Sequence, residues 1–319
     1  MTARTLIHDG DHGGDDFITT LMILGRPDLF DLRAITSNFG NVPLDLAADN
    51  ALRALALGGR TDIPVYKGAE KPFRTPLKGG DDAHGENGIG GAVLPLPAIK
   101  PQDRHAVDVL IETLENAPAP ITICPTGPLT NMARVLERAP HLKSKIEKLI
   151  IMGGGGGPGI KGHIKGNITK FAEFNFYMDP DAADYVLKSG VNLVLHGLST
   201  THQLLYAPDK HHRITSIAPH GETLSTIMRA AEHLDQKNFG ENGAYIHDEN
   251  TVCYLAHPEL YDTKRVHLSV NTDPASPEVG NLIIGDEDPH APTELVTNLN
   301  NPDAAFDFIA DCLQRLFRS

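Results

Sequence analysis

The sequence has few cysteines and lacks any long apolar segment. Its three cysteines, Cys124, Cys253 and Cys312, lie far apart and form no CxxC pair, which argues against a disulfide framework and against a thiolate zinc site. No apolar run approaches the roughly 18 residues that mark a candidate membrane helix, and the segment from Met1 to Ile7 holds no apolar core of a secretory signal. These absences predict a cytoplasmic protein with reduced cysteines and no membrane partner.

Clusters of basic residues are missing as well. The formal net charge is -13 at pH 7, and no long group of lysines or arginines offsets it locally. Such a surface would repel a phosphate backbone, so we expect no nucleic-acid partner. A small neutral or cationic ligand, or a metal ion, fits this charge better.

Short apolar segments alternate with longer helical patterns along the 319 residues, without a repeat of fixed period or a low-complexity linker. Such alternation is typical of βαβ units. It predicts an α/β fold in which residues 1–319 form a single domain around one doubly wound, mainly parallel sheet flanked by helices. The expected strands are Thr5 to Ile7, Leu32 to Thr36, Ile121 to Cys124, Lys148 to Met152 and Val191 to Leu195, and the expected helices include Asp16 to Leu24, Leu44 to Leu57 and Asp179 to Lys188.

Several other segments are less regular. Lys71 to Gly91 and Asp235 to Tyr245 are polar and glycine-bearing, so we interpret both as active-site loops. The glycine run that follows Met152 lacks the Gly-Lys-Ser/Thr of a phosphate-binding loop, and we interpret it as a turn or as a close approach of the backbone to a ligand. From Asp262 to Ser319 we expect one strand and a terminal helix.

The most informative segment is the octet Asp-Gly-Asp-His-Gly-Gly-Asp-Asp at residues 9–16, between the first expected strand and the first expected helix. Its four carboxylates repel one another unless a cation or hydrogen-bond donors collect them. Ligands of open α/β sheets bind at the carboxyl ends of the strands, where the octet lies. Asp15 and Asp16 fall in the first helical turn, where the helix dipole favours negative charge. The octet therefore predicts a cation site at this edge of the sheet.

The donor types narrow the choice of cation and of site. Oxygen ligands without cysteine favour calcium or magnesium over zinc, and calcium, which accepts looser geometry, is the first choice. An EF-hand is excluded, because counting from Asp11 puts Asp16 where that loop needs glycine and Met22 where it needs glutamate. A phosphohydrolase with an aspartyl nucleophile and a solvated cluster that only caps the helix stay open as alternatives.

Taken with four later segments, the octet resembles the inosine-uridine-preferring nucleoside hydrolase family. The five segments occur in the order found in the family and cover roughly residues 4 to 260. The resemblance implies a Rossmann-like fold and an enzyme that hydrolyses the N-glycosidic bond of ribonucleosides to ribose and free base. The later segments are Gly40-Asn41, Pro125 to Asn131, Ala172 to Asn175 leading to Asp179-Pro180, and His247-Asp248.

The resemblance also implies roles for individual residues. Asp11, Asp16 and Asp248, with the main-chain carbonyl of Thr126, match the Ca2+ ligands of the family, and Asp11 matches its general base. His247 matches a histidine that assists departure of the base. Family members are commonly homo-oligomers, which implies a homodimer or homotetramer. The residues that match those holding the ribose hydroxyls are Asp15, Asn41, Asn167, Glu173, Asn175 and Asp248.

The chemistry of glycosidic cleavage agrees with these residue types. Positive charge develops on the ribose, so the transition state resembles an oxocarbenium ion and is stabilised by nearby carboxylates. A divalent cation lowers the pKa of its bound water, from which Asp11 can take a proton. An imidazole that titrates near neutrality, such as His247, is a suitable acid for the departing base. A metal-dependent phosphohydrolase and a non-catalytic, metal-stabilised riboside-binding protein remain the alternatives.

The sequence departs from the family pattern at three positions. His12 stands where proline is usual, Asn87 where serine is frequent and Ser199 where an acidic residue is common, and these departures bear on substrate preference more than on the reaction class. One branch of the family stacks purines on tryptophan, and because the chain has no tryptophan we do not expect it in that branch. Phe239 or Tyr245 could stack a base instead, and Asp9 looks like an outer partner of the cation site.

Overall fold

A nine-stranded sheet forms the centre of the computed structural model, which describes residues 3–74, 85–157 and 164–318. The strands are β1 (Arg4–Gly10), β2 (Phe30–Ser37), β3 (Val65–Lys67), β4 (Ile121–Pro125), β5 (Ile146–Met152), β6 (Leu193–His196), β9 (Tyr261–Val270), β10 (Leu282–Glu287) and β11 (Thr293–Leu299). Their order in the sheet is β10-β9-β11-β6-β5-β4-β1-β2-β3. Neighbours run parallel from β11 to β3, whereas β9 pairs antiparallel with β10 and with β11. The predicted mainly parallel sheet is confirmed.

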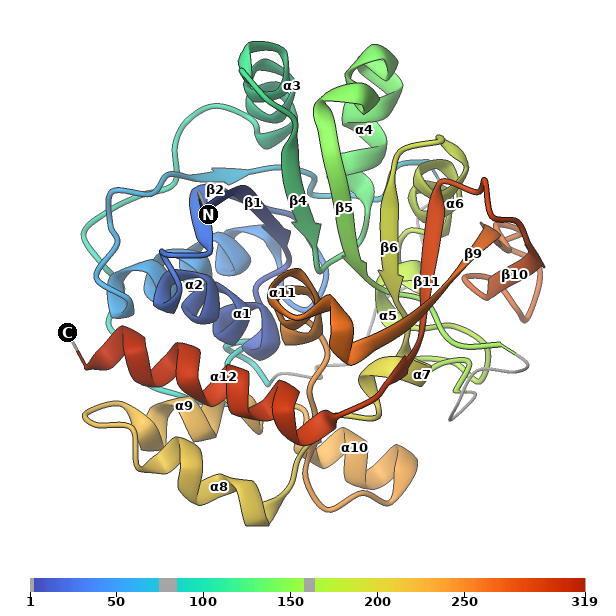
Figure 1. Cartoon of the computed structure of the whole chain (residues 1–319). Helices are drawn as coiled ribbons and strands as arrows, with labels where there is room; N and C mark the ends of the chain where they lie inside the picture. The colour runs from blue at the N-terminus through green and yellow to red at the C-terminus, as the bar shows by residue number, and fades with distance from the viewer. Residues whose placement is uncertain (1–2, 75–84, 158–163, 319) are drawn as a thin grey trace.

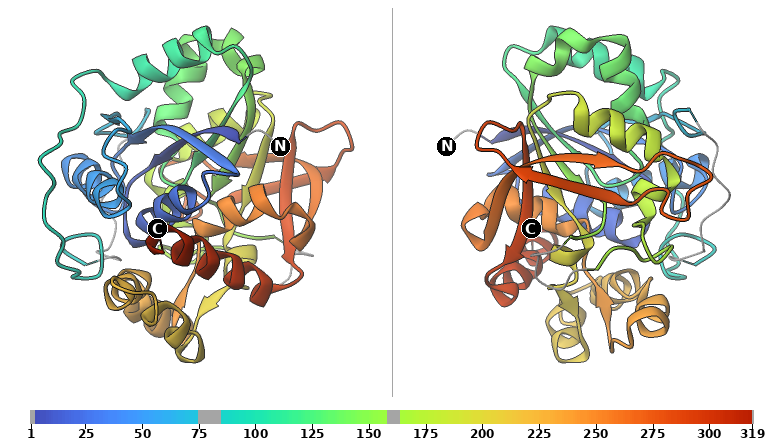
Figure 2. Two further views of the ribbon diagram at one scale, coloured as in Figure 1. Left: turned by 60° about the vertical axis from the view of Figure 1, so that its left-hand side comes forward. Right: turned by 90° about the vertical axis from the view of Figure 1, so that its right-hand side faces the viewer.

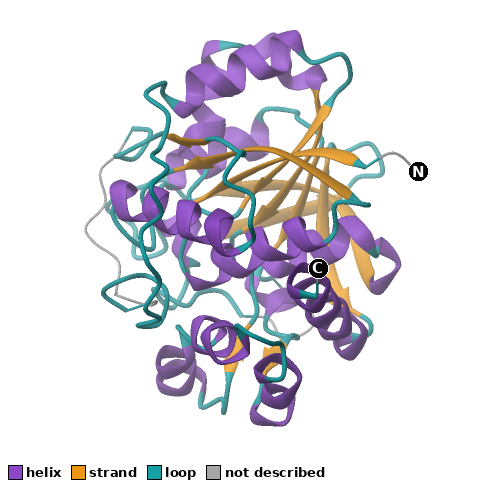
Figure 3. Cartoon of the chain, turned by 90° about the vertical axis from the view of Figure 1, so that its left-hand side faces the viewer, coloured by secondary structure: helices purple, strands orange, loops and turns teal. Residues whose placement is uncertain are grey.

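Helices cover both faces of this sheet, as Figures 1 and 3 show. One face carries α1 (Gly14–Gly25), α2 (Leu44–Leu57), α11 (Glu249–Ala256) and α12 (Pro302–Phe317), which share one hydrophobic core. The other face carries α3 (Ala106–Asn116), α4 (Thr130–Arg138) and α6 (Pro180–Lys188), which share a second core. Neighbouring residues of β1 divide between the two, because Leu6 packs into the first core and Ile7 into the second. Burial on both faces explains why the central strands contain short runs of consecutive apolar residues.

A third group of helices lies beyond the carboxyl ends of the parallel strands, at the bottom of Figures 1 and 2. It consists of α8 (Pro208–Thr215), α9 (Gly221–Met228) and α10 (Glu232–Phe239), with the two-stranded sheet of β7 (Leu205–Tyr206) and β8 (Ala244–Tyr245). Two short helices, α5 (Phe174–Met178) and α7 (Leu198–Thr201), follow β5 and β6. In the described part of the chain, no helix is both long and apolar enough to cross a membrane.

Three expectations about individual segments need correction. The region from Asp235 to Tyr245 is not wholly a loop, because α10 extends through Phe239. The segment from Asp262 onward contains three strands before its terminal helix, where we expected one. The first helix begins at Gly14, two residues before the expected start. Residues 75–84 of the other expected loop lie outside the described residues, and residues 85–91 of it form turns in which the Asn87 side chain accepts from the N–H groups of Ile89 and Gly91.

Candidate active site

The octet forms the turn between β1 and α1. Because β2 and β4 flank β1 as parallel neighbours, residues that follow these three strands meet at one edge of the sheet. The Asp16 carboxylate closes the first turn of α1 by accepting a hydrogen bond from the Gly13 N–H at 3.1 Å. Its other oxygen accepts from the hydroxyl of Thr126, the residue after β4, at 2.5 Å. Asp16 is therefore oriented by the octet and by the neighbouring strand together.

Asp11 lies beside Asp16 and is completely buried. Asn41, in the segment after β2, donates its backbone N–H to Asp11 Oδ2 at 2.6 Å and its side-chain amide to Asp11 Oδ1 at 3.1 Å. The approach is close, because a Cβ atom on Gly40 would lie 1.8 Å from Asp11 Oδ2. Glycine at this position thus lets the segment after β2 reach the Asp11 carboxylate.

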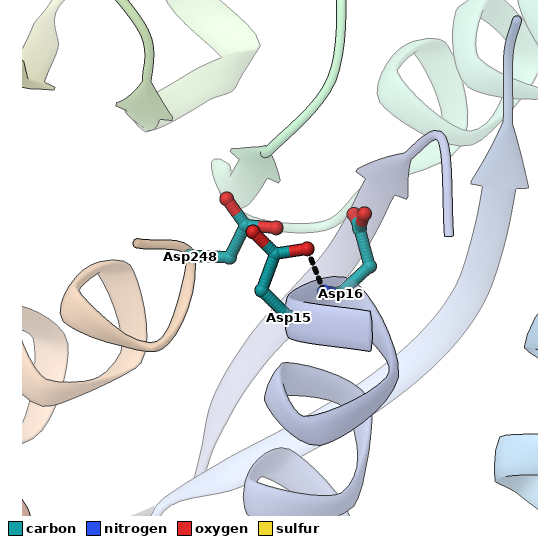
Figure 4. Close-up of side chains that lie close together, drawn as sticks. All are labelled: Asp15, Asp16 and Asp248. Atoms are coloured by element: carbon teal, nitrogen blue, oxygen red, sulfur yellow. Dashed lines mark hydrogen bonds between the residues drawn. The ribbon is translucent and has the colours of Figure 1, made fainter. Parts of the chain in front are cut away.

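Asp15, Asp16 and Asp248 form a carboxylate trio (Figure 4). Each presents one oxygen, and these oxygens all lie within 4.8 Å of one another. Asp248 stands directly before α11, and its buried Oδ2 has no hydrogen-bond partner among the described residues. Asp11, which the sequence analysis placed among the metal ligands, is outside this trio, and its oxygens accept from Asn41 instead.

Burial and nearby negative charge favour the neutral forms of the carboxyl groups of Asp11, Asp16 and Asp248. Burial, helped by the nearby charge of Asp15, raises the pKa of Asp16 to about 7. Burial and the charge of Asp16 raise the pKa of Asp11 well above its usual range. Burial and the charge of Asp15 do the same for the pKa of Asp248. Carboxylates packed in this way are ionised together only where positive charge joins them.

A divalent cation fits this donor set. Hard cations prefer carboxylate oxygens, and two oxygens on opposite sides of a calcium ion, each at about 2.4 Å, lie about 4.8 Å apart. The trio oxygens lie no farther apart than this. The unpartnered Asp248 Oδ2 also needs a positive or hydrogen-bonding partner. The cluster is therefore able to hold a metal ion.

A cavity lies beside the trio, and concave sites of this kind are where proteins commonly bind small organic ligands. Its wall includes every predicted site residue except the two buried aspartates Asp11 and Asp16. The wall therefore joins residues from almost the whole length of the chain. The predicted residues on it are Asp15, Asn41, Thr126, Asn167, Glu173, Asn175, His247 and Asp248.

Glu173 is the most firmly held of the predicted ribose-binding residues. It caps α5, and its carboxylate accepts from the backbone N–H groups of Asn175 at 2.7 Å, Phe176 at 3.1 Å and Gly154 at 2.7 Å. Burial raises its pKa to about 7. The predicted turn after β5 thus brings Gly154, in the glycine run 153–157, against this carboxylate. Gly154 adopts a left-handed φ of 72°, a conformation that glycine favours.

Two of the asparagines on the same wall, Asn167 and Asn175, also have backbone partners. The Asn175 amide donates to the Thr126 carbonyl at 2.9 Å and to the Met152 carbonyl at 3.3 Å. The Asn167 carbonyl oxygen accepts from the Phe174 N–H at 3.0 Å. These hydrogen bonds fix the polar side chains before any ligand arrives, which lowers the entropy cost of binding.

His247 stands on the cavity wall beside a group of aromatic rings. Its Nδ1 lies 2.8 Å from the Thr201 hydroxyl at the end of α7. The His202 ring stacks on Tyr245 with centroids 3.7 Å apart and meets Phe239 edge-on. Of the two aromatic residues expected to stack a base, Phe239 lines the cavity. Tyr245 is not among the lining residues of this cavity, and its ring stacks on His202.

The sequence analysis predicted an active-site segment from Asp235 onward, but it did not recognise the helix α10 or single out four cavity-lining residues on it and just before it. The missed residues have a helical spacing of i, i+3, i+4 and i+7, and the same spacing could have revealed the helix. Asp235 is the charged member: its carboxylate accepts from the Tyr245 N–H at 2.8 Å, and burial raises its pKa to about 7. The cavity residues missed on this segment are Ala231, Leu234, Asp235 and Asn238.

The three departures from the family pattern lie off the cavity wall. His12 is buried in the octet with a φ of 30°, and neither ring nitrogen has a hydrogen-bond partner among the described residues. The Ser199 hydroxyl accepts from the Ile164 N–H at 2.9 Å. Asn87 holds turns next to the octet, where the Asn50 amide donates to the carbonyls of both His12 and Asn87.

The sequence profile of a family described as inosine-uridine preferring nucleoside hydrolase matches residues 6–306. The chain belongs to this family. Membership confirms the resemblance recognised in the sequence and identifies the chain as a nucleoside hydrolase, an enzyme that acts on N-glycosyl compounds.

Several nucleoside hydrolases are similar to this one over most of their length. The pyrimidine-specific ribonucleoside hydrolase RihA of Shewanella sp. strain ANA-3 is 39% identical over 273 residues, which are 85% of this chain and 83% of the relative. RihA of Escherichia coli O9:H4 is 41% identical over 277 residues, 85% of each chain. The solved structure of the purine-preferring ribonucleoside hydrolase from Gardnerella vaginalis matches with a TM-score of 0.88 at 28% identity, over 99% of this chain and 100% of that chain.

Proposed function

We propose that the chain hydrolyses the N-glycosidic bond of ribonucleosides in a calcium-dependent reaction. The proposal is carried by one observation: Asp15 and Asp248 of the carboxylate trio line the same cavity as the polar side chains expected to bind ribose. A nucleoside needs polar partners for its sugar and an apolar surface for its base. Ile168, Phe174, Leu234 and Phe239 on the cavity wall supply the apolar surface.

Asp16, Asp248, Asp11 and the Thr126 carbonyl are the groups that we assign to the calcium ion. When bound, the cation lowers the pKa of a coordinated water molecule. The cluster's negative charge also favours the positive charge that develops on the ribose. Asp15 reaches the cavity wall, and we assign it to a ribose hydroxyl together with Asn41, Asn167, Glu173, Asn175 and Asp248.

Asp11 is the residue that we assign as general base. Its carboxylate lies next to Asp16, and the two Asn41 donors hold its plane in one orientation. In this role an Asp11 oxygen accepts the proton of the water that attacks the anomeric carbon. Asn41 therefore serves the reaction by positioning the base as well as by facing the cavity.

His247 is the residue that we assign to the departing base. The Thr201 hydroxyl contacts Nδ1, and we assign Nε2 to donate a proton to the nucleobase as the glycosidic bond breaks. Protonation avoids the release of an anionic base and contributes on the order of 10²-fold to 10⁴-fold in rate for a well-placed acid.

Release of free ribose tests the proposal against its alternatives. The purified protein is incubated with inosine, adenosine, guanosine, uridine and cytidine, with added calcium or with a calcium chelator. We expect ribose with calcium and little without it. A phosphohydrolase would release phosphate from nucleotides instead, and a riboside-binding protein would release nothing. The panel covers purines and pyrimidines because the relatives named above differ in base preference.

The remaining features of the proposal follow the sequence analysis. We propose that residues 1–319 form a single domain, that the protein assembles as a homodimer or homotetramer, and that it is located in the cytoplasm. Sedimentation of the purified protein tests the assembly, because a purely monomeric species would contradict it.

A further inference from the structure

A buried row of side chains leads from the interior of the protein to Asp16 of the carboxylate trio. It begins at Thr20 on α1, continues through His8 on β1 and the Thr126 hydroxyl, and ends at Asp16. His8 Nδ1 lies 3.0 Å from the Thr20 hydroxyl oxygen and His8 Nε2 lies 2.9 Å from that of Thr126. The Thr126 hydroxyl is 2.5 Å from Asp16 Oδ1. All four residues are at most 1% exposed.

The direction of these hydrogen bonds follows from the chemistry of the groups. An ionised Asp16 can only accept, so the single hydroxyl proton of Thr126 points to it. The Thr126 oxygen then accepts from a proton on His8 Nε2. In the neutral ring, His8 Nδ1 carries no proton and accepts from the Thr20 hydroxyl. His8 and the Thr126 hydroxyl therefore each have one partner on either side within the row, and the Asp9 carbonyl, 3.5 Å from the Thr126 hydroxyl oxygen, is a longer alternative acceptor.

The surroundings leave the row little freedom. A Cβ atom on Gly10 would lie 2.1 Å from Asp16 Oδ1 and 2.9 Å from the Thr126 hydroxyl oxygen. The Thr126 main chain is held as well, because its N–H donates to the Asp9 carbonyl at 2.9 Å and its carbonyl accepts from Asn175. The hydroxyl and the carbonyl of Thr126 are thus oriented by two separate sets of partners.

We propose that His8 is a positioning residue for the cation site, which orients the Thr126 hydroxyl and through it the Asp16 carboxylate. The inference rests on the proposed calcium site. His8 does not line the cavity, and its Nε2 lies 3.7 Å from Asp16 Oδ1, beyond hydrogen-bond distance. It acts by pre-setting a ligand oxygen, as outer partners of metal ligands do.

Calorimetric calcium titration of four proteins tests the proposal. His8→Leu keeps an apolar side chain of similar size and removes both hydrogen bonds, and we expect a loss of about tenfold in calcium affinity, the lower end for outer partners of metal ligands. In His8→Gln the amide nitrogen can still donate to Thr126, so its affinity should stay close to that of the unchanged protein. His196→Leu is the matched control: His196 is also buried at the end of a central strand, but its ring contacts Tyr254 and Tyr261, and its loss should leave calcium affinity unchanged.

Two further measurements keep the test decisive if His8→Leu does not fold. Thr20→Val removes only the partner of His8 Nδ1 and should weaken calcium binding in the same direction. Nitrogen NMR of the calcium-loaded, unchanged protein should find the His8 ring proton on Nε2. Calcium affinity that is equal in the unchanged protein, His8→Leu and Thr20→Val, or a His8 proton only on Nδ1, would overturn the positioning role alone. Failure of the unchanged protein to bind calcium would overturn the proposed calcium site and this inference with it.

Discussion

Asn41 donates to both oxygens of Asp11, once from its backbone and once from its side chain, at 2.6 and 3.1 Å. The pair joins the segment after β2 to the octet after β1 and fixes the plane of the carboxylate. An ionised carboxylate satisfies both donors at once, whereas an amide in its place accepts with only one of its two terminal atoms.

The first prediction concerns Asp11→Asn. Turnover should fall by about 10²-fold or more, the scale at which loss of a general base is commonly felt. Calcium affinity should fall moderately, because one charge is lost and one Asn41 donor is left facing an amide nitrogen. A ribose-bearing inhibitor should still bind at saturating calcium. Steady-state kinetics and inhibitor titration measure the two effects, and near-normal turnover would remove Asp11 from the role of base.

Asp15→Asn separates a ribose contact from a metal contact. If Asp15 binds a ribose hydroxyl, the variant should lose much activity on ribonucleosides and little further activity on substrates that lack that hydroxyl. Discrimination between uridine and deoxyuridine should therefore shrink, since an unpaired buried partner is what penalises the missing group. Kinetics on both substrates at saturating calcium measure it. An equal loss on both, together with weakened calcium binding, would instead place Asp15 with Asp16 and Asp248 as a metal ligand.

His247→Ala tests the departure of the base. Turnover of inosine or uridine should fall by about 10²-fold or more, as expected when a general acid is lost. A riboside whose leaving group is a stable phenolate needs no proton and should keep most of its rate. Thr201→Val, which keeps the imidazole and loses its Nδ1 partner, should have a smaller effect with the same substrate pattern. Equal losses on both kinds of substrate would argue for a binding role of His247.

Stability should depend on pH through Asp16. Burial raises its pKa in the folded protein from 3.8 to about 7, so between these values the folded state binds more protons than the unfolded state. The free energy of unfolding contributed by Asp16 is therefore fully present below pH 3.8 and is lost as pH rises to about 7. Calcium selects the ionised carboxylates, so its stabilising effect should grow over the same range.

Urea unfolding with a calcium chelator measures this effect as the difference between the unchanged protein and Asp16→Asn, which cannot titrate at this position. The free energy of unfolding of the unchanged protein should fall relative to that of Asp16→Asn as pH rises from 4 to 7, the window set by the two pKa values. A difference that stays constant across the window, or that changes in the opposite direction, would show that Asp16 is not held in the neutral form.

The central strands and the acidic cluster at the end of β1 were predictable because their signals are local. β1, β4 and β5 are buried on both faces and appear as short apolar runs. The octet concentrates charge that only a cation or strong donors can collect, at the end of a strand where parallel sheets bind ligands. Identity of the family was equally readable, because its motifs are short segments in a constant order.

The antiparallel edge could not be read in the same way. β9 carries Lys264 and Arg265 within a largely exposed strand, where they pair with Glu287 of β10 and Glu294 of β11. Charged residues of this kind indicate a strand only when the register of the partner strands is known. The short helix α10 was not recognised because its sequence is polar and is followed by Gly240. Its residues at helical spacing line a cavity rather than a hydrophobic core.

The sequence by itself determined the layered α/β fold, the family and the residue types of the site, because these depend on burial patterns and on segments of a few residues. Only the tertiary structure decided how the carboxylates divide. One oxygen from each of Asp15, Asp16 and Asp248 lies within 4.8 Å of the others, whereas both oxygens of Asp11, beside Asp16, accept from Asn41. Donors from other strands make that choice: Asn41 after β2 for Asp11 and Thr126 after β4 for Asp16. Side-chain orientation follows from the positions of such partners, and these exist only once distant strands lie side by side.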